Sequence, residues 1–124
     1  MKIIGKRVHA ILDYFYGVLA IASPWLFGFA DFGTAKWCAV VVGVLTLVMS
    51  LLTDYEGGKG KLISMPMHLN LDLLIGVFFA ASPWLFGFSE LVRTPHVVFG
   101  IFALVASMLT VRTSLHTNVT EMGR

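Results

Sequence analysis

The feature that most constrains how this chain can fold is a segment of 21 residues that occurs twice. Residues 9–29 read HAILDYFYGVLAIASPWLFGF, and residues 68–88 read HLNLDLLIGVFFAASPWLFGF. A shift of 59 positions superposes His9 on His68 and Asp13 on Asp72, and the run SPWLFGF is identical in both copies. An internal duplication of this kind predicts that the chain is built from two copies of one structural unit.

Each copy continues into a second apolar segment. Gly43 and Ser50 after the first copy correspond to Gly100 and Ser107 after the second. The repeat unit is therefore a pair of apolar segments, and we predict four in all, at residues 8–29, 35–53, 67–88 and 95–113. Because about 20 helical residues cross a bilayer core, and because lipid cannot satisfy backbone hydrogen bonds, we expect all four to be transmembrane α-helices.

Composition supports a membrane protein and excludes other classes. The chain is 57% hydrophobic and only 13% charged, whereas about 25% charged residues are typical of soluble proteins. The net charge of +2 is small and the basic residues are scattered, so we expect no nucleic-acid partner. The single cysteine, Cys38, excludes an intrachain disulfide.

The distribution of Lys and Arg predicts the orientation in the membrane. Seven of them lie in the N-terminal arm, the central linker and the tail, and two lie in the hairpin loops: Lys2, Lys6, Arg7, Lys59, Lys61, Arg112 and Arg124 against Lys36 and Arg93. Cytoplasmic segments are enriched in such residues, so both termini and the linker are expected in the cytoplasm. Both repeats then cross in the same sense, related by a pseudo-two-fold axis along the membrane normal.

The expected organisation is one membrane domain. It comprises repeat 1 at residues 8–53, a cytoplasmic linker at 54–66, repeat 2 at 67–113 and a cytoplasmic tail at 114–124. Thr34 is the expected N-cap of the second helix, and Thr94 that of the fourth, with Pro95 in its first turn. Gly28 and Gly87 mark the ends of the first and third helices.

Small and polar residues share one face of the first helix of each repeat, about 120° wide at 100° per residue. The two sets are His9, Asp13, Tyr16, Gly17, Ala20, Ser23, Pro24 and Phe27, and His68, Asp72, Ile75, Gly76, Phe79, Ser82, Pro83 and Phe86. We expect this face to contact protein. Trp25 and Trp84 point elsewhere and are expected to anchor at the membrane interface.

The Ser-Pro pairs have two interpretations. Pro24 and Pro83 lack an amide hydrogen, so either each helix bends there or it stops and restarts as a short interfacial turn. A fixed bend is favoured over a transport hinge, since proline kinks in membrane helices are commonly structural.

Small residues of the first and second helices predict close helix packing: Gly17, Gly76, Gly43, Ser50, Gly100 and Ser107.

The duplicated His-Asp pair is the one chemical constellation in the sequence. His9 and Asp13, and likewise His68 and Asp72, are one helical turn apart, and packing of the repeats would gather all four near the cytoplasmic end. Three interpretations are open: a structural polar cluster that holds the helices together, a proton or cation pathway, and a divalent metal site made by all four residues. No catalytic motif is present, so no enzymatic activity is expected. His96 and His116 are assigned no role.

The two Ser-Pro-Trp triplets, at residues 23–25 and 82–84, resemble those of the SPW-repeat family of small prokaryotic membrane proteins. The resemblance implies two transmembrane helices per repeat and location in the cytoplasmic (inner) membrane, and it implies no activity. We therefore expect a non-enzymatic membrane protein with an assembly or accessory role, embedded in the lipid bilayer as a homo-oligomer or in a larger membrane complex. A small oligomeric proton or cation transporter is the alternative, and a divalent metal-binding protein the third. No cofactor is predicted, and a divalent metal at the His/Asp residues is left open.

Overall fold

The computed structural model describes residues 3–53 and 62–110, and the regular elements of these two stretches are four α-helices. They are α1 (Lys6–Leu26), α2 (Gly33–Leu52), α3 (Met65–Leu85) and α4 (Thr94–Leu109). The linker predicted at 54–66 is described only from residue 62, and the tail predicted at 114–124 lies outside the described residues, as do Lys59, Lys61, Arg112, His116 and Arg124.

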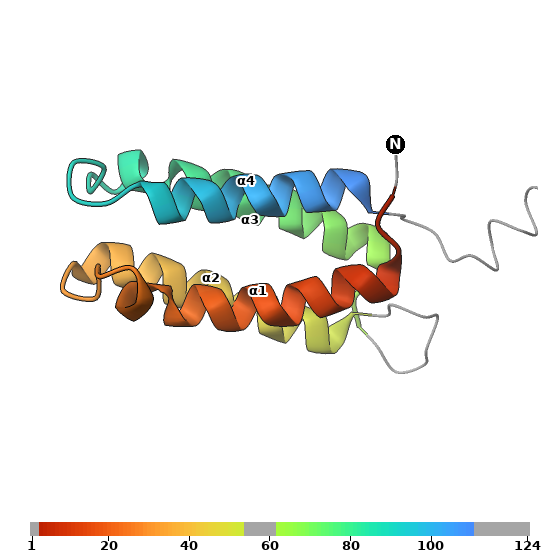
Figure 1. Cartoon of the computed structure of the whole chain (residues 1–124). Coiled ribbons are helices and arrows are strands. Elements are labelled where there is room, and N and C mark those ends of the chain that lie inside the picture. Colours follow the sequence, from red (N-terminus) through yellow and green to blue (C-terminus); the bar gives the residue numbers. More distant parts are fainter. Residues whose placement is uncertain (1–2, 54–61, 111–124) are drawn as a thin grey trace, which may run out of the picture.

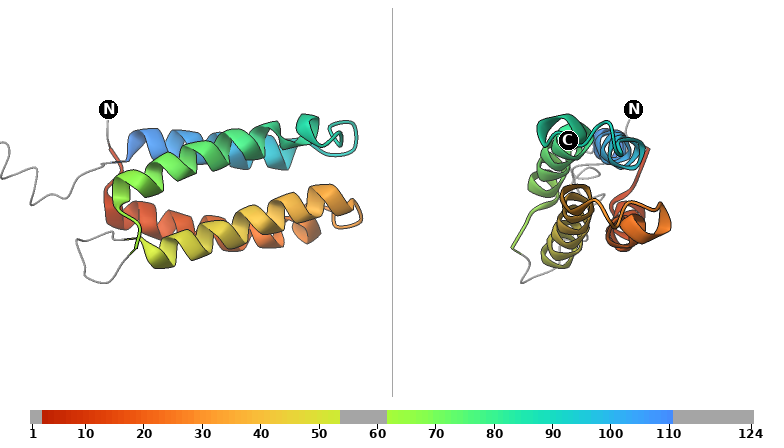
Figure 2. Two further views of the ribbon diagram at one scale, coloured as in Figure 1. Left: turned by 180° about the vertical axis from the view of Figure 1, so that it is seen from behind. Right: turned by 90° about the vertical axis from the view of Figure 1, so that its left-hand side faces the viewer.

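The helices form two hairpins, α1–α2 and α3–α4, that lie side by side (Figure 1). Both hairpin loops, at residues 27–32 and 86–93, are at one end of the bundle, which we call the loop end. The two helices of a hairpin pack closely along their length, whereas the hairpins contact each other more sparsely. Figure 2 shows the four helices end on, with one hairpin beside the other.

At the opposite end, which we call the cluster end, each hairpin is tied to the segment that leads into the other. Ile4 precedes α1, and its amide donates to the carbonyl of Leu109 at the end of α4 (2.9 Å). Ile63 precedes α3, and its amide donates to the carbonyl of Leu52 at the end of α2 (3.0 Å). These contacts hold the start of each repeat against the end of the other.

Two predicted N-caps were wrong by one or two residues, whereas both glycines predicted to mark helix ends do so. The predicted segments 8–29 and 67–88 nevertheless extend three residues beyond the ends of α1 and α3, at Leu26 and Leu85. The N-cap of α2 is Phe32 rather than Thr34, and that of α4 is Arg93 rather than Thr94, so both threonines lie within the first helical turn. The side chain of neither N-cap residue accepts a hydrogen bond from a backbone amide of the first turn. The usual preference for a polar N-cap residue therefore does not locate these two helix starts. Gly28 and Gly87 have φ angles of 75° and 74°, the left-handed conformation that ends helices.

The helices run through their prolines instead of stopping and restarting. Pro24 lies inside α1 and has no amide hydrogen for the carbonyl of Ala20, four residues earlier. The hydroxyl of Ser23 donates to that carbonyl instead, at 2.7 Å. In α3, Ser82 donates to the carbonyl of Phe79 at 2.7 Å, again four residues before the proline. The serine of each Ser-Pro pair thus replaces the hydrogen bond that the proline removes.

Glycine pairs set the close approach of the helices within each hairpin. A Cβ atom on Gly43 of α2 would lie 2.7 Å from the carbonyl oxygen of Gly17 in α1. A Cβ atom on Gly100 of α4 would lie 2.6 Å from the carbonyl oxygen of Gly76 in α3. Both distances are shorter than a side chain allows, so the backbones touch where these residues lack side chains.

The outer surface is apolar, as expected of a protein in lipid. Ile11, Phe15 and Val18 on α1 are 60–70% exposed, and Leu74 on α3 is 68% exposed. Of the four predicted transmembrane helices, α2 and α3 are long and apolar enough to cross a membrane by length and composition. The 21-residue α1 is not among them, and α4 is apolar but has 16 residues. At 1.5 Å per residue α4 spans about 24 Å, less than the roughly 30 Å of a bilayer core.

Candidate functional site: a buried His/Asp cluster

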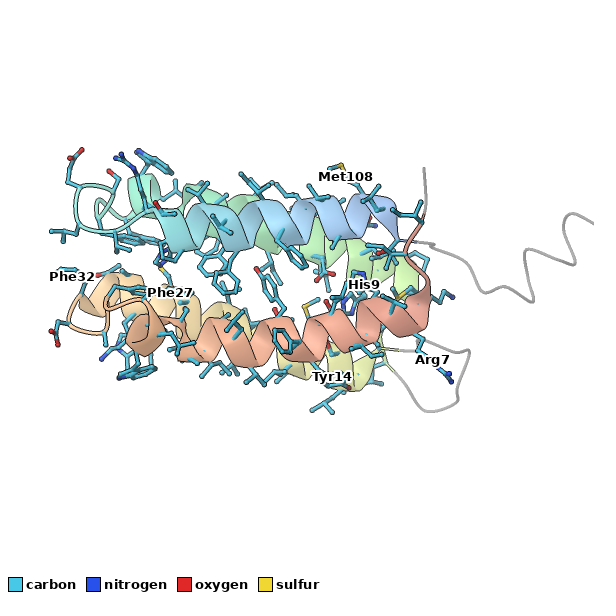
Figure 3. All side chains as sticks on the ribbon, in the orientation of Figure 1. Arg7, His9, Tyr14, Phe27, Phe32 and Met108 are labelled. Atoms are coloured by element: carbon cyan, nitrogen blue, oxygen red, sulfur yellow. The ribbon has the colours of Figure 1, made fainter. Side chains whose placement is uncertain are left out.

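Four ionisable side chains meet inside the bundle near the cluster end. His9 and Asp13 come from α1, and His68 and Asp72 from α3, and one ligand atom from each lies within 4.8 Å of those of the other three. We call these four residues the His/Asp cluster. None is more than 8% exposed. Figure 3 shows His9 directed between the hairpins, whereas Arg7 and Tyr14 point away from the bundle.

The contacts within the His/Asp cluster join the two hairpins as closely as they join residues of one helix. Nε2 of His9 lies 3.0 Å from Oδ2 of Asp72 and 3.2 Å from Oδ2 of Asp13. Nε2 of His68 lies 2.8 Å from Oδ2 of Asp13 and 3.2 Å from Oδ2 of Asp72. The four atoms therefore form a closed ring in which nitrogen and oxygen alternate, with every neighbouring pair in contact.

A threonine from the opposite hairpin holds each imidazole. Nδ1 of His9 lies 2.7 Å from Oγ1 of Thr110, which follows α4, and Nδ1 of His68 lies 2.6 Å from Oγ1 of Thr53, which follows α2. Both hydroxyls donate their one hydrogen to a backbone carbonyl, that of Ala106 or Met49. Each can then only accept from the imidazole, so Nδ1 carries a hydrogen in both rings.

Because both Nδ1 atoms carry a hydrogen, the amount of positive charge needed at the centre of the His/Asp cluster can be worked out. With Nδ1 protonated, the Nε2 atom of a neutral imidazole presents a lone pair to the carboxylate oxygens, which repels them. Two ionised carboxylates buried together need two compensating positive charges. Two additional protons shared among the four groups would supply them, and so would one divalent cation at the centre.

Little space is left around the His/Asp cluster. A cavity of about 10 Å³ adjoins His9, Asp13 and Asp72, with room for about one water molecule. Tyr16 lines this cavity and its hydroxyl donates to the carbonyl of Phe99, at 2.9 Å. Toward the loop end, the described core consists mainly of aromatic and small apolar side chains, among them Phe29, Phe79 and Phe88.

The predicted polar face is buried except at its end. Tyr16, Gly17, Ala20, Ser23 and Pro24 are all buried, as are their counterparts except Ile75, which is partly buried. Phe27 and Phe86, expected on the same face, are 57% and 51% exposed. They follow the last helical residues as C-caps, and so leave the helical register. Trp25 and Trp84 point outward, at 63% and 57% exposed.

The small residues of the second helices are buried with the others. Ser50 and Ser107 are 1% and 0% exposed, and their hydroxyls have no hydrogen-bond partner. Thr53 and Thr110, which follow Ser50 and Ser107 as the C-caps of α2 and α4, are the partners of the imidazoles. Their position in the chain distinguishes them. Each ends the second helix of a hairpin, at the same end of the bundle where α1 and α3 begin and carry the histidines.

His96 is the buried polar residue that sequence analysis left without a role. It is fully buried near the loop end, and its Nε2 donates to the carbonyl of Ala35 in α2, at 2.9 Å. The rings of Phe29, Phe79 and Phe88 surround it, with centroids 4.9–5.3 Å from its own. His96 therefore links the two hairpins at the end opposite the His/Asp cluster. Its counterpart in the first repeat is Ala39, so the duplication carries no signal for it.

A family model described as the SPW repeat domain matches residues 7–110, which include both hairpins and the whole His/Asp cluster. No curated protein and no solved structure matches the chain.

Proposed function

Because this chain belongs to the SPW repeat family, we propose that it is a non-enzymatic inner-membrane protein in which the His/Asp cluster joins two transmembrane hairpins. All four helices cross the bilayer, with the termini and the central linker in the cytoplasm and the loop end outside. The excess of Lys and Arg in the N-terminal arm, linker and tail supports this orientation. The two hairpins are related by a pseudo-two-fold axis along the membrane normal.

The observation that carries the proposal is that the His/Asp cluster takes two residues from each hairpin. The hairpins otherwise contact each other sparsely, and lipid supplies no hydrophobic force to drive them together. Hydrogen-bonded and charged contacts at one end, with the His96 contact at the other, therefore carry much of the association between them. Interhelical contacts of this kind contribute about 0.6–2 kcal/mol each in membranes.

The biological role that fits this architecture is that of an assembly or accessory subunit. The outer faces of the helices present apolar side chains such as Phe15 and Leu74, which suit contact with lipid or with the helices of a membrane partner. The test is crosslinking in intact cells followed by purification of the full chain in mild detergent. A reproducible membrane partner at fixed stoichiometry supports the accessory role, and its loss on substituting outward-facing residues would map the contact.

An ion-transport role is the outcome that would overturn this proposal. Purified protein in liposomes should show no flux of protons, sodium, potassium or divalent cations above that of empty liposomes, in an assay that detects a known channel. If flux is present, Asp13→Asn and Asp72→Asn decide its origin, because asparagine keeps the shape and cannot ionise. Asp31→Asn, at an exposed loop position, is the matched control. Flux abolished in the first two and kept in the third would establish a pathway through the His/Asp cluster.

A further inference from the structure

We propose that the His/Asp cluster binds one divalent transition-metal ion, with zinc as the representative metal. The ligands are Nε2 of His9, Nε2 of His68 and one carboxylate oxygen each from Asp13 and Asp72. The inference rests on the proposed function in that it names the ligand of the same four residues, and it makes the metal part of the link between the hairpins.

The spacing of the four atoms fits a metal ion at their centre. The ring of alternating nitrogen and oxygen atoms has edges of 3.0, 3.2, 2.8 and 3.2 Å. An ion at the centre of such a ring would lie about 2 Å from the four atoms, close to zinc–nitrogen distances of about 2.0–2.1 Å and zinc–oxygen distances of about 2.0–2.2 Å.

The threonines supply the outer support that metal-binding histidines commonly have. A histidine that ligates through one ring nitrogen usually donates the hydrogen of the other to a fixed acceptor, which orients the ring. Thr53 and Thr110 are such acceptors, and each is itself fixed by donating to a backbone carbonyl. Both Nε2 atoms are thereby turned toward the two carboxylates.

Charge and ligand type select the class of metal. Two carboxylates and two neutral imidazoles carry a charge of −2, so one divalent cation makes the buried centre neutral. Two imidazole ligands suit zinc, iron, cobalt or nickel, whereas calcium and magnesium prefer a full set of oxygen ligands. The adjoining cavity of about 10 Å³ admits at most about one water molecule as a fifth ligand.

The first experiment measures metal in the wild-type chain. The full chain is purified in detergent with a tag that contains no histidine, and its metal content is determined by mass spectrometry before and after chelation and after return of Zn²⁺. One metal ion per chain that survives gel filtration is expected. Co²⁺ in place of Zn²⁺ should give the visible absorption of a four-coordinate ion. Metal content far below one ion per chain with Zn²⁺, Co²⁺, Fe²⁺ and Ni²⁺ would overturn the proposal.

The second experiment tests the site with variants that leave all four ligands in place. Thr53→Val and Thr110→Val remove the acceptors of the two Nδ1–H groups, together with one hydroxyl–carbonyl hydrogen bond each. Each should weaken Zn²⁺ affinity about 10–100-fold. Ser82→Ala is the matched control, because the Ser82 hydroxyl is equally buried and donates to a backbone carbonyl, that of Phe79, ten residues along α3 from Asp72. Equal affinity in all three variants and the wild type would show that the threonines do not orient metal ligands, and would overturn the site as drawn.

The metal proposal and the proposed function fail separately. If no metal binds but Asp72→Asn still weakens the association of the hairpins, protons bridge the His/Asp cluster and only the metal site is wrong. If one metal binds per chain but its removal and Asp72→Asn leave unfolding unchanged, the metal site stands and the proposal that the His/Asp cluster joins the hairpins is wrong.

Discussion

His9 lies closer to Asp72, on the other hairpin, than to Asp13 on its own helix: the Nε2–Oδ2 distances are 3.0 and 3.2 Å. The same holds for His68, which is 2.8 Å from Asp13 and 3.2 Å from Asp72. The pairs that look intrahelical in the sequence are therefore interlocked between hairpins. Any change at one of the four residues alters contacts on both sides.

Coupling between His9 and Asp72 should be measurable directly. We expect His9→Gln and Asp72→Asn to be non-additive in the free energy of unfolding, with a coupling energy of about 0.5–3 kcal/mol, because the two side chains touch. The measurement is unfolding in mixed detergent–SDS micelles for the wild type, both single variants and the double variant. Asp72→Asn combined with Ser23→Ala, at the opposite end of the bundle, should be additive to within about 0.5 kcal/mol. Additivity in the first pair as well would contradict the contact.

The serine before each proline should matter more than other buried serines. Ser23→Ala leaves the carbonyl of Ala20 without the hydroxyl that replaces the missing proline amide, so we expect a loss of about 1–3 kcal/mol of unfolding free energy. Ser50→Ala is the control, since the Ser50 hydroxyl is buried and makes no hydrogen bond. The same unfolding assay applies, and equal losses in the two variants would refute the role assigned to Ser23.

Close backbone contact predicts an unusual cost for adding one methyl group at Gly43. In Gly43→Ala the new Cβ would meet two backbone atoms, the Gly17 oxygen at 2.7 Å and the Ile21 nitrogen at 2.9 Å. We expect destabilisation of about 1–3 kcal/mol by overpacking. Gly33→Ala, in the first turn of the same helix with nothing within 4 Å, should be neutral or stabilising by up to about 1 kcal/mol. If Gly43→Ala is as well tolerated as Gly33→Ala, the helices do not touch there.

The orientation in the membrane can be tested at exposed, described positions. In a Cys38→Ser background, Asp31→Cys and Glu90→Cys at the loop end should react with an impermeant maleimide in intact cells. Gly5→Cys and Leu62→Cys, at the cluster end, should react only after permeabilisation. Labelling of Asp31→Cys and Glu90→Cys from opposite sides would exclude the parallel arrangement of the hairpins.

Much of the fold follows from the duplicated pattern, because two physical signals agree. A polar face within an otherwise apolar segment predicts which side contacts protein, and a repeat predicts that the second copy behaves likewise. The gathering of His9, Asp13, His68 and Asp72 follows from these signals together. The exposure of Phe27 does not, because the periodicity continues on paper after the helix has ended at Leu26.

The contacts that orient the site were not predictable from periodicity. Thr53 and Thr110 continue the helical spacing of the small residues that precede them, and their role depends on which helix end lies beside which histidine. That is a tertiary relationship, set by the way each repeat begins against the other. His96 escaped for a related reason, since its partner is the backbone carbonyl of Ala35 and a carbonyl has no sequence signature.

The exchange of threonines between hairpins bears on how such a chain arises. His9 is oriented by Thr110, and His68 by Thr53, so a single hairpin contains a histidine and a threonine that do not serve each other. If two identical copies of one hairpin paired in this way, the threonine of each copy would accept a hydrogen bond from the histidine of the other. A chain of one repeat would therefore form the complete His/Asp cluster only as a pair of polypeptides. Joining the two copies in one chain keeps the exchange of threonines and lets each copy change separately. His96 and its counterpart Ala39 are one such difference.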